Sequence, residues 1–181
     1  MGDGGGILTS DESCLRAVHM LRDYGQSKKY RHDILGYNSR LDELQAGLLR
    51  TVYLPRLKGW LQKRSEIAAR YLTEIRNQAV ELINFPTGSD SSWHLFPILV
   101  PPDRKRDFLE HLANRMICAG EHYPVAIPDQ AALAGASSEI LPGGIERARR
   151  FCRSQVSLPI HAYLTDAEVS KVIDTVNQWA G

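Results

Sequence analysis

The chain changes character at Gly36-Tyr37-Asn38-Ser39-Arg40-Leu41, where a polar segment gives way to a long helical pattern. From Ser39 onward apolar residues recur three or four positions apart, and the pattern continues beyond Pro55 as far as Ile75. Proline lacks a backbone donor and its ring clashes with the preceding turn, so we expect a kink or a break at Pro55. The pattern predicts two helices, one on each side of Pro55, that connect an N-terminal region (residues 1–54) with a C-terminal region (residues 55–181). The apolar positions of the pattern are Leu41, Leu44, Leu48, Val52, Leu57, Trp60, Leu61, Ile67, Ala68, Tyr71, Leu72 and Ile75.

The region before the connector predicts one strand and one helix. Gly6-Ile7-Leu8-Thr9 has the form of a short strand. Thr9-Ser10-Asp11-Glu12 has the form of a capping box, in which threonine and glutamate satisfy each other's free backbone donors. The helix that follows should end at Gly25, which favours the left-handed conformation. Residues 26–38 lack periodicity and predict a loop, whose length for a compact domain suggests a functional role.

The region after the connector predicts a mixture of strands and helices. Thr165-Asp166-Ala167-Glu168 is a second capping box and should open a terminal helix. A short helix is expected after Pro128. Short strands and helices joined by short loops indicate a small α+β domain over residues 55–181. The other predicted strands span 80–83, 93–100, 117–122 and 156–158, and the other predicted helices span 104–116 and 145–152.

Composition and charge exclude several classes of protein. Of 181 residues, 43% are hydrophobic and 24% are charged, which is typical of a globular chain rather than a disordered one. The 22 basic and 21 acidic residues leave a net charge of +1, so no overall field favours nucleic acid or an anionic membrane. No apolar run approaches the roughly 20 residues that a bilayer span needs. We therefore expect a cytoplasmic protein with no nucleic-acid or membrane partner.

The three cysteines give no sign of a metal centre or a disulfide framework. Cys14, Cys118 and Cys152 are an odd number, lie far apart and form no CxxC pair. We expect them to be reduced, buried and apolar in behaviour, and we expect no metal site.

Two segments could bind a ligand through polar side chains. Asn38 could be the N-cap of the connector helix or the residue before it, or its amide could meet an anion near the free N–H groups of a helix start. His122 and Tyr123 end a predicted strand and precede a proline-rich loop. They could orient a polyhydroxy substrate or relay a proton, or they could be no more than an exposed strand end.

Two further segments are weaker candidates. Gly2-Asp3-Gly4-Gly5-Gly6 could cradle a phosphate through backbone donors, but it fits neither common phosphate-loop pattern and is more typical of a tight turn. Arg147, Arg149, Arg150 and Arg153 predict a solvated helix face, because no aromatic residues alternate with them to stack on bases. No spacing in the chain indicates a Ser-His-Asp or Cys-His catalytic arrangement.

Seven short motifs are spread from end to end of the chain. They are Gly2-Asp3-Gly4-Gly5-Gly6-Ile7-Leu8-Thr9, Leu21-Arg22-Asp23-Tyr24-Gly25, Gly36-Tyr37-Asn38-Ser39-Arg40-Leu41-Asp42-Glu43-Leu44-Gln45-Ala46, Arg64 to Tyr71, Trp93-His94-Leu95-Phe96, His122-Tyr123-Pro124 and Ser157-Leu158-Pro159-Ile160. In this order they resemble the sugar aminotransferases of the DegT/DnrJ/EryC1/StrS family, which are pyridoxal-phosphate enzymes of aspartate-aminotransferase fold type.

The resemblance implies a fold and an activity. The fold class is α+β: residues 1–54 would be a remnant of the large α/β cofactor-binding domain, and residues 55–181 would be the C-terminal small domain of a fold-type I aminotransferase. The activity would be pyridoxal 5'-phosphate-dependent transamination of a keto group on a nucleotide-linked deoxysugar, with glutamate as the expected donor. Such enzymes serve surface-polysaccharide or amino-sugar biosynthesis, and the complete enzyme would be a homodimer.

The resemblance also implies roles for three residues of this chain. Asn38 matches the asparagine that reaches across the dimer interface to the cofactor phosphate of the neighbouring subunit. His122 and Tyr123 match the strand-end motif that lines the sugar pocket. Family members commonly carry a His-Tyr-Pro-x-Pro-x-His-x-Gln run, whereas residues 122–130 read HYPVAIPDQ, so Pro128 replaces the second histidine.

The resemblance finally implies an absence. In the family, the lysine that forms the Schiff base lies a few residues before the Gly-Asp-Gly-Gly turn with which this chain begins, and the aspartate and aromatic residue that hold the cofactor ring also precede it. Lys28, Lys29, Lys58 and Lys63 do not stand at the motif position. We therefore expect a C-terminal fragment, or the product of a truncated reading frame, with no catalytic residue and no activity alone. The alternative is a non-catalytic interaction or dimerisation module, and either reading leaves apolar faces within residues 2–52 partly open.

Overall fold

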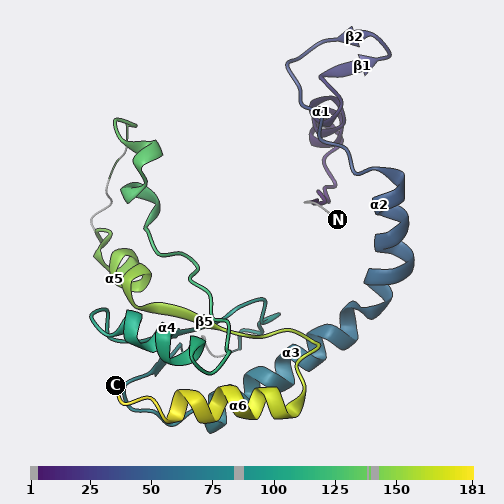
Figure 1. Cartoon of the computed structure of the whole chain (residues 1–181). Coiled ribbons are helices and arrows are strands. Elements are labelled where there is room, and N and C mark those ends of the chain that lie inside the picture. The colour runs from purple at the N-terminus through teal and green to yellow at the C-terminus, as the bar shows by residue number, and fades with distance from the viewer. Residues whose placement is uncertain (1–3, 84–87, 138, 140–142) are drawn as a thin grey trace. The chain divides into compact units, whose positions relative to one another are not determined.

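The computed structural model describes residues 4–83, 88–137, 139 and 143–181. Helices and small antiparallel sheets make up the chain, which confirms the predicted α+β class (Figure 1). The chain divides into two compact units, Met1–Leu57 and Lys58–Gly181.

The cap of the first helix lies two residues later than predicted, at Asp11 instead of Thr9. Helix α1 spans Glu12–Arg22, and the Asp11 carboxylate caps it by accepting from the backbone N–H groups of Ser13 and Cys14. Thr9 is not the cap: its hydroxyl accepts from the backbone N–H of Asp11 instead. The predicted strand over residues 6–9 is absent from the described part of this segment. Gly2 and Asp3 of the glycine cluster lie outside the described residues.

The predicted loop over residues 26–38 contains a small hairpin instead. Strand β1 (Gln26–Lys28) pairs antiparallel with β2 (Arg31–His32). Polar contacts between side chains and the backbone hold this hairpin, rather than apolar packing. Gln26 Oε1 accepts from the Tyr30 N–H, and His32 Nδ1 lies 2.8 Å from the Tyr24 carbonyl oxygen. Polar contacts of this kind have no periodicity in the sequence, and for that reason the loop prediction was wrong.

Gly25 adopts the left-handed conformation after α1, as predicted. Its φ is +76°, and its N–H donates to the Met20 carbonyl oxygen at 2.7 Å. A Cβ at Gly25 would lie 1.7 Å from the Ile34 carbonyl oxygen, and a Cβ at Gly36 would lie 2.1 Å from the Gly25 nitrogen. The two backbones therefore approach too closely for any side chain at either glycine.

The connector helix is capped by Asp42, and its turns are wider than those of an α-helix just before Pro55. Asp42 caps α2 (Glu43–Leu48) in a capping box with Gln45, so Asn38 is not the N-cap of this helix. A π-helical stretch, η1 (Leu49–Tyr53), precedes α3 (Leu54–Glu74). The disturbance expected at Pro55 is thus a π-helical segment just before the proline. Its wider turn makes room for the proline ring, and the regular hydrogen bond that the proline nitrogen cannot donate is not needed there.

A three-stranded sheet organises residues 58–181. Strand β4 (Phe96–Leu99) lies in the centre, antiparallel to β3 (Glu81–Leu82) on one side and to β5 (Gln155–Leu158) on the other. Phe96 is paired with Leu158, and Ile98 with Val156. The predicted strand over 117–122 was wrong, because only the isolated bridge between Gly120 and Ser157 forms there.

Helices surround this sheet. Figure 1 shows α6 (Asp166–Asn177) beside the C-terminal half of α3. The two helices exchange end contacts: the Asn77 amide donates to the carbonyl oxygens of Val176 and Trp179, and the Asn177 amide donates to that of Glu74. The predicted Thr165 capping box opens α6 and is confirmed. The remaining helices are α4 (Lys105–Ala113), the 3-10 turns η2 (Ile127–Asp129) and η3 (Ala131–Leu133), α5 (Glu146–Ser154) and α6 (Asp166–Asn177).

Within the described residues, the buried hydrophobic side chains all belong to the second unit. Tyr71 of α3 packs edge-on against Phe96 of β4 with ring centroids 5.0 Å apart, and Phe108 of α4 packs against Trp179. Among the described residues of the first unit no large apolar side chain is buried: Leu8 is 100% exposed and Leu44 is 78% exposed. The expectation that apolar faces in this segment are open is confirmed.

The buried hydroxyl of Tyr71 should stabilise the second unit. It donates to the Pro159 carbonyl oxygen at 2.8 Å. We predict that Tyr71→Phe lowers the free energy of unfolding by about 1 kcal/mol in chemical denaturation, because the carbonyl loses its buried donor. The control Tyr163→Phe, at a ring that is 74% exposed, should leave it unchanged. Burial also raises the pKa of Tyr71 well above its ordinary value.

The pH dependence follows from that raised pKa. An unfolded tyrosine ionises near about pH 10 while folded Tyr71 keeps its proton, so this contribution is intact below about pH 10 and falls as pH rises further. Tyr71→Phe should lack that part of the alkaline loss of stability. Equal alkaline slopes for both proteins would contradict the assignment.

Two glycines offer a matched pair of substitutions. Gly25→Ala should speed hydrogen exchange at the amides of Tyr24, Asp33 and Tyr37, because the new Cβ cannot fit against Ile34. Gly59→Ala places its Cβ in open space within α3 and should raise the free energy of unfolding by about 0.5–1 kcal/mol. Wild-type exchange at those amides in Gly25→Ala would contradict the steric argument.

Candidate functional site

The predicted pair His122 and Tyr123 lies beside strand β5. The Gly120 and Ser157 backbones exchange two hydrogen bonds, of 3.0 and 2.7 Å, which hold the segment against the strand. The His122 backbone N–H then donates to Gln155 Oε1 at 2.7 Å, and its Nδ1 lies 3.0 Å from the Ser157 hydroxyl. Two side chains of one strand thus hold both the backbone and the ring of His122.

Gln155 and Ser157 are buried although both are polar. Gln155 is 0% exposed, and its amide nitrogen lies 2.6 Å from the Ser157 hydroxyl oxygen. Strand residues two apart share a face, so these two point the same way while Val156 and Leu158 point to the opposite, apolar face. Sequence reasoning missed both as site residues, but the polar-apolar alternation across residues 155–158 was the available signal.

Gly120 makes room for the imidazole ring. A Cβ at this position would lie 2.6 Å from Cε1 of His122, closer than real Cβ contacts allow. Tyr123 is 71% exposed, and its ring lies edge-on to that of His122 with centroids 5.6 Å apart. The structure therefore brings the two predicted residues together, one half-buried and held, the other open.

A buried lysine that contacts the residue before His122 is already paired. Lys105 of α4 donates to the Cys152 carbonyl oxygen at 3.0 Å and forms an ion pair with Glu121. Lys105 therefore offers no free amine beside His122.

The loop that follows His122 forms an ion pair with helix α5, which carries four arginines. Arg149 of α5 forms ion pairs with Asp129 at 2.7 Å and with Glu146 at 2.8 Å. Its hydrogen bonds lower the pKa of Asp129 below the ordinary value. The predicted solvated face is confirmed for Arg147, Arg150 and Arg153, which are exposed, but not for Arg149, which is half-buried and paired.

Asn38 lies in the first unit, beside the end of α1. Its backbone forms an isolated bridge with Asp23, and the following N–H, of Ser39, donates to the Arg22 carbonyl oxygen. Its side-chain oxygen accepts from Arg40 Nε at 3.3 Å, and the whole residue is exposed. The amide and the guanidinium together present hydrogen-bond donors suited to an anion.

An open hollow of about 400 Å³ accompanies Arg40. It carries three cationic side chains, those of Lys28, Lys29 and Arg40, and Arg40 lies over the Tyr24 ring at 5.4 Å. Sequence reasoning left these cations unassigned because the hairpin that gathers them was not predicted. Its lining residues are Asp23, Tyr24, Gln26, Ser27, Lys28, Lys29, Tyr30 and Arg40.

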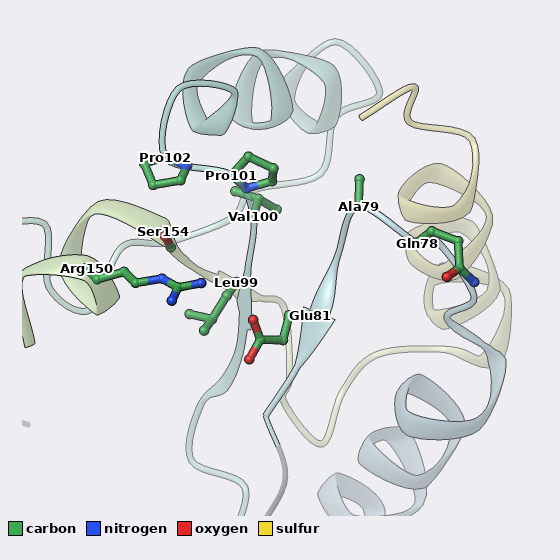
Figure 2. Close-up of a pocket in the computed structure, with 9 residues that line it drawn as sticks. All are labelled: Gln78, Ala79, Glu81, Leu99, Val100, Pro101, Pro102, Arg150 and Ser154. Atoms are coloured by element: carbon green, nitrogen blue, oxygen red, sulfur yellow. The ribbon is translucent and has the colours of Figure 1, made fainter. Parts of the chain in front are cut away.

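A second hollow, also of about 400 Å³, lies at the end of the sheet where Glu81 of β3 is paired with Leu99 of β4, and α5 contributes Arg150 and Ser154 to it. Figure 2 shows Glu81 and Arg150 at its rim with Leu99 between them, and Pro101 and Pro102 above. None of the predicted site residues lines it. The hollow is therefore separate from the His122 site.

Three further observations concern possible metal ligands, the cysteine thiols and membrane-spanning helices. Within the described ranges, no group of three or more His, Cys, Asp or Glu side chains could hold a metal ion. The expectation of buried cysteines was wrong, since Cys14 and Cys118 are exposed and Cys152 is half-buried, all three as free thiols. No helix in the described part of the chain is long and apolar enough to cross a bilayer.

Comparison with known proteins gives consistent matches over the whole chain. A dTDP-3-amino-3,4,6-trideoxy-α-D-glucose transaminase from Streptomyces venezuelae is 38% identical over 180 residues, which are 99% of this chain and 46% of that protein. A dTDP-3-amino-3,6-dideoxy-α-D-galactopyranose transaminase from Aneurinibacillus thermoaerophilus is 37% identical, over 97% of this chain and 47% of its own length. The chain thus spans about half the length of the curated relatives it matches.

Solved structures agree with these sequence matches. The crystal structure of S. venezuelae DesV in complex with a ketimine intermediate superposes with a TM-score of 0.86 at 37% identity, over 96% of this chain and 46% of that one. The family model for the DegT/DnrJ/EryC1/StrS aminotransferase family matches residues 1–177. The chain therefore belongs to the DegT/DnrJ/EryC1/StrS aminotransferase family.

Proposed function

We propose that this chain is the C-terminal part of a pyridoxal 5'-phosphate-dependent aminotransferase that converts a keto group on a nucleotide-linked deoxysugar to an amine. The family match over residues 1–177 carries the proposal. The transaminase names of relatives that are 38% and 37% identical support the substrate class. Glutamate as donor, a homodimer and a cytoplasmic location belong to the same proposal.

The described residues fit one part of the cofactor. Bound pyridoxal phosphate supplies an electron sink for bonds at the donor's α-carbon. Asn38, with Arg40 at 3.3 Å, offers N–H donors that suit the phosphate, and both side chains are accessible. We propose that Asn38 binds the cofactor phosphate of a neighbouring subunit, with the Arg40 guanidinium adding positive charge beside it.

His122 and Tyr123 would hold the sugar. A held imidazole and an exposed phenol together offer directional hydrogen bonds to hydroxyl oxygens. Their rings lie at a 72° interplanar angle, so a sugar could meet the edge of one ring and the face of the other. The resemblance places a second histidine where this chain has Pro128, so we expect the sugar that fits here to differ from that of members with the histidine.

The transfer also needs a free amine that moves a proton, and no lysine of this chain stands at the motif position for it. Lys105 is paired with Glu121 and Cys152, Lys63 is paired with Asp166, and Lys28 and Lys29 lie exposed on the hairpin. The amine would therefore come from the N-terminal half of an aminotransferase fold. We propose that the chain alone does not catalyse transamination.

A chimera tests the proposal. The chain is joined to the N-terminal part of the S. venezuelae transaminase, so that the fused protein has the length of a relative. We expect the chimera to bind pyridoxal phosphate and to transfer an amino group from glutamate to a dTDP-linked keto-sugar, and the chain alone to do neither. A folded chimera that binds the cofactor but aminates no nucleotide-linked keto-sugar would overturn the proposed function.

The same chimera tests Asn38. Asn38→Ala should weaken cofactor binding about 10- to 100-fold, the effect of losing one hydrogen bond to a charged group. Asn114→Ala, at the exposed end of α4, is the control and should leave it unchanged. Equal cofactor affinities for the two variants would remove Asn38 from the site.

A second candidate function is a non-catalytic partner of a complete aminotransferase. The open apolar side chains of the first unit favour it, since Leu8 and Leu44 are 100% and 78% exposed. Co-expression with a full-length relative should then give a complex that Leu44→Asp weakens, while Tyr163→Asp, at an exposed ring of the second unit, does not. Failure to form any complex would exclude this function.

A further inference from the structure

The orientation of the Gln155 amide is set by the backbone of His122. The His122 N–H is a donor only, so the atom that it meets at 2.7 Å must be the amide oxygen of Gln155. The amide nitrogen then faces the Ser157 hydroxyl oxygen at 2.6 Å and donates to it. One lone pair of the Ser157 hydroxyl is thereby occupied, while its proton remains to be placed.

The imidazole of His122 lies at this hydroxyl, with its Nδ1 3.0 Å away. If Nδ1 carried a proton, Ser157 would accept two hydrogen bonds and its own proton would need a third partner. Among the residues that the structure describes, the Ser157 hydroxyl contacts no other acceptor, and the residue is only 4% exposed. An unpaired buried hydroxyl proton is costly.

The opposite arrangement pairs every group. Gln155 donates to Ser157, and Ser157 donates to an unprotonated Nδ1, so each polar atom has a partner and the two hydrogen bonds strengthen one another. The proton of the neutral imidazole then resides on Nε2. Within the described part of the chain Nε2 has no hydrogen-bond partner, and His122 as a whole is half-buried.

We propose that Gln155 and Ser157 are positioning residues that hold neutral His122 in the Nε2–H tautomer, so that its free ring nitrogen is a hydrogen-bond donor. The group that it would bind is an oxygen acceptor, such as a sugar hydroxyl or a carbonyl oxygen. That last identification rests on the proposed function, whereas the tautomer does not. In this state His122 orients its ligand and does not act as a general base, because its basic nitrogen is occupied by Ser157.

Nitrogen-15 NMR of the whole chain tests the tautomer directly. Long-range spectra recorded at about pH 8.5, where imidazoles are ordinarily neutral, distinguish the protonated from the unprotonated ring nitrogen. His122→Gln identifies the signals by their loss. We expect Nδ1 of His122 to be the unprotonated nitrogen, with the Nε2–H form favoured about tenfold, the ratio that one net hydrogen bond supplies.

His111 serves as an internal reference. Its Nε2 lies 2.9 Å from the Thr175 carbonyl oxygen and its Nδ1 lies 3.0 Å from the Arg115 guanidinium, so it must be protonated at Nε2. Its signals should be unchanged in every variant that remains folded. His111 thus separates a local change at His122 from loss of the fold.

Two substitutions test the cause. Ser157→Ala should lower the tautomer ratio of His122 several-fold, and Ser157→Thr, which keeps the hydroxyl, should restore it. Protonated Nδ1 in the wild-type chain would overturn the proposal, and that measurement needs no variant to fold. A wild-type ratio in Ser157→Ala with His111 unchanged would overturn the role of Ser157. Neither result depends on transaminase activity, so failure here is distinct from failure of the proposed function.

Discussion

The pairing of β4 with β5 is the constraint on which the rest of the second unit depends. It matches Phe96 with Leu158 and Ile98 with Val156, which places apolar side chains of both strands in the core. The alternation along a strand then leaves Gln155 and Ser157 together on the other face. A slip of one residue would bury these polar side chains in the apolar core and remove both partners of His122. Core packing and site geometry are therefore fixed by one register.

Sequence reasoning worked best where a local chemical signal determines the structure. The Thr165 capping box and the left-handed Gly25 were predicted correctly, because each depends on residues adjacent in the chain. The Asn38 cap and the 26–38 loop were wrong for the opposite reason. A competing cap at Asp42 and hydrogen bonds between separated residues, such as His32 to Tyr24, decided those segments. The candidate site shows the same division, since the resemblance proposed a role for His122 but gave none to Gln155 and Ser157, the strand residues that hydrogen-bond to it.

The two units differ in how their folds are stabilised. In the second unit, side chains such as Tyr71, Phe96 and Phe108 are removed from water, and apolar burial is the main favourable contribution to folding. The described part of the first unit relies on backbone contacts around Gly25 and Gly36, on the Asp11 cap and on exposed ion pairs that contribute little each. That contrast agrees with a chain that spans about half the length of its relatives. Secondary structure is retained where the chain bonds to itself locally, while apolar surface is left uncovered.

Gly120 contributes to the His122 site by having no Cβ atom. The space where a Cβ would stand is occupied by the edge of the His122 ring, while Ser157 holds the ring from another side. The imidazole therefore loses its rotational freedom when the chain folds rather than when a ligand arrives. Ordering a side chain during binding costs about 0.5–1.5 kcal/mol, and a ring that is already ordered avoids this loss of affinity. Preorganisation at this site is thus encoded in a glycine, which a search for polar or charged residues would pass over.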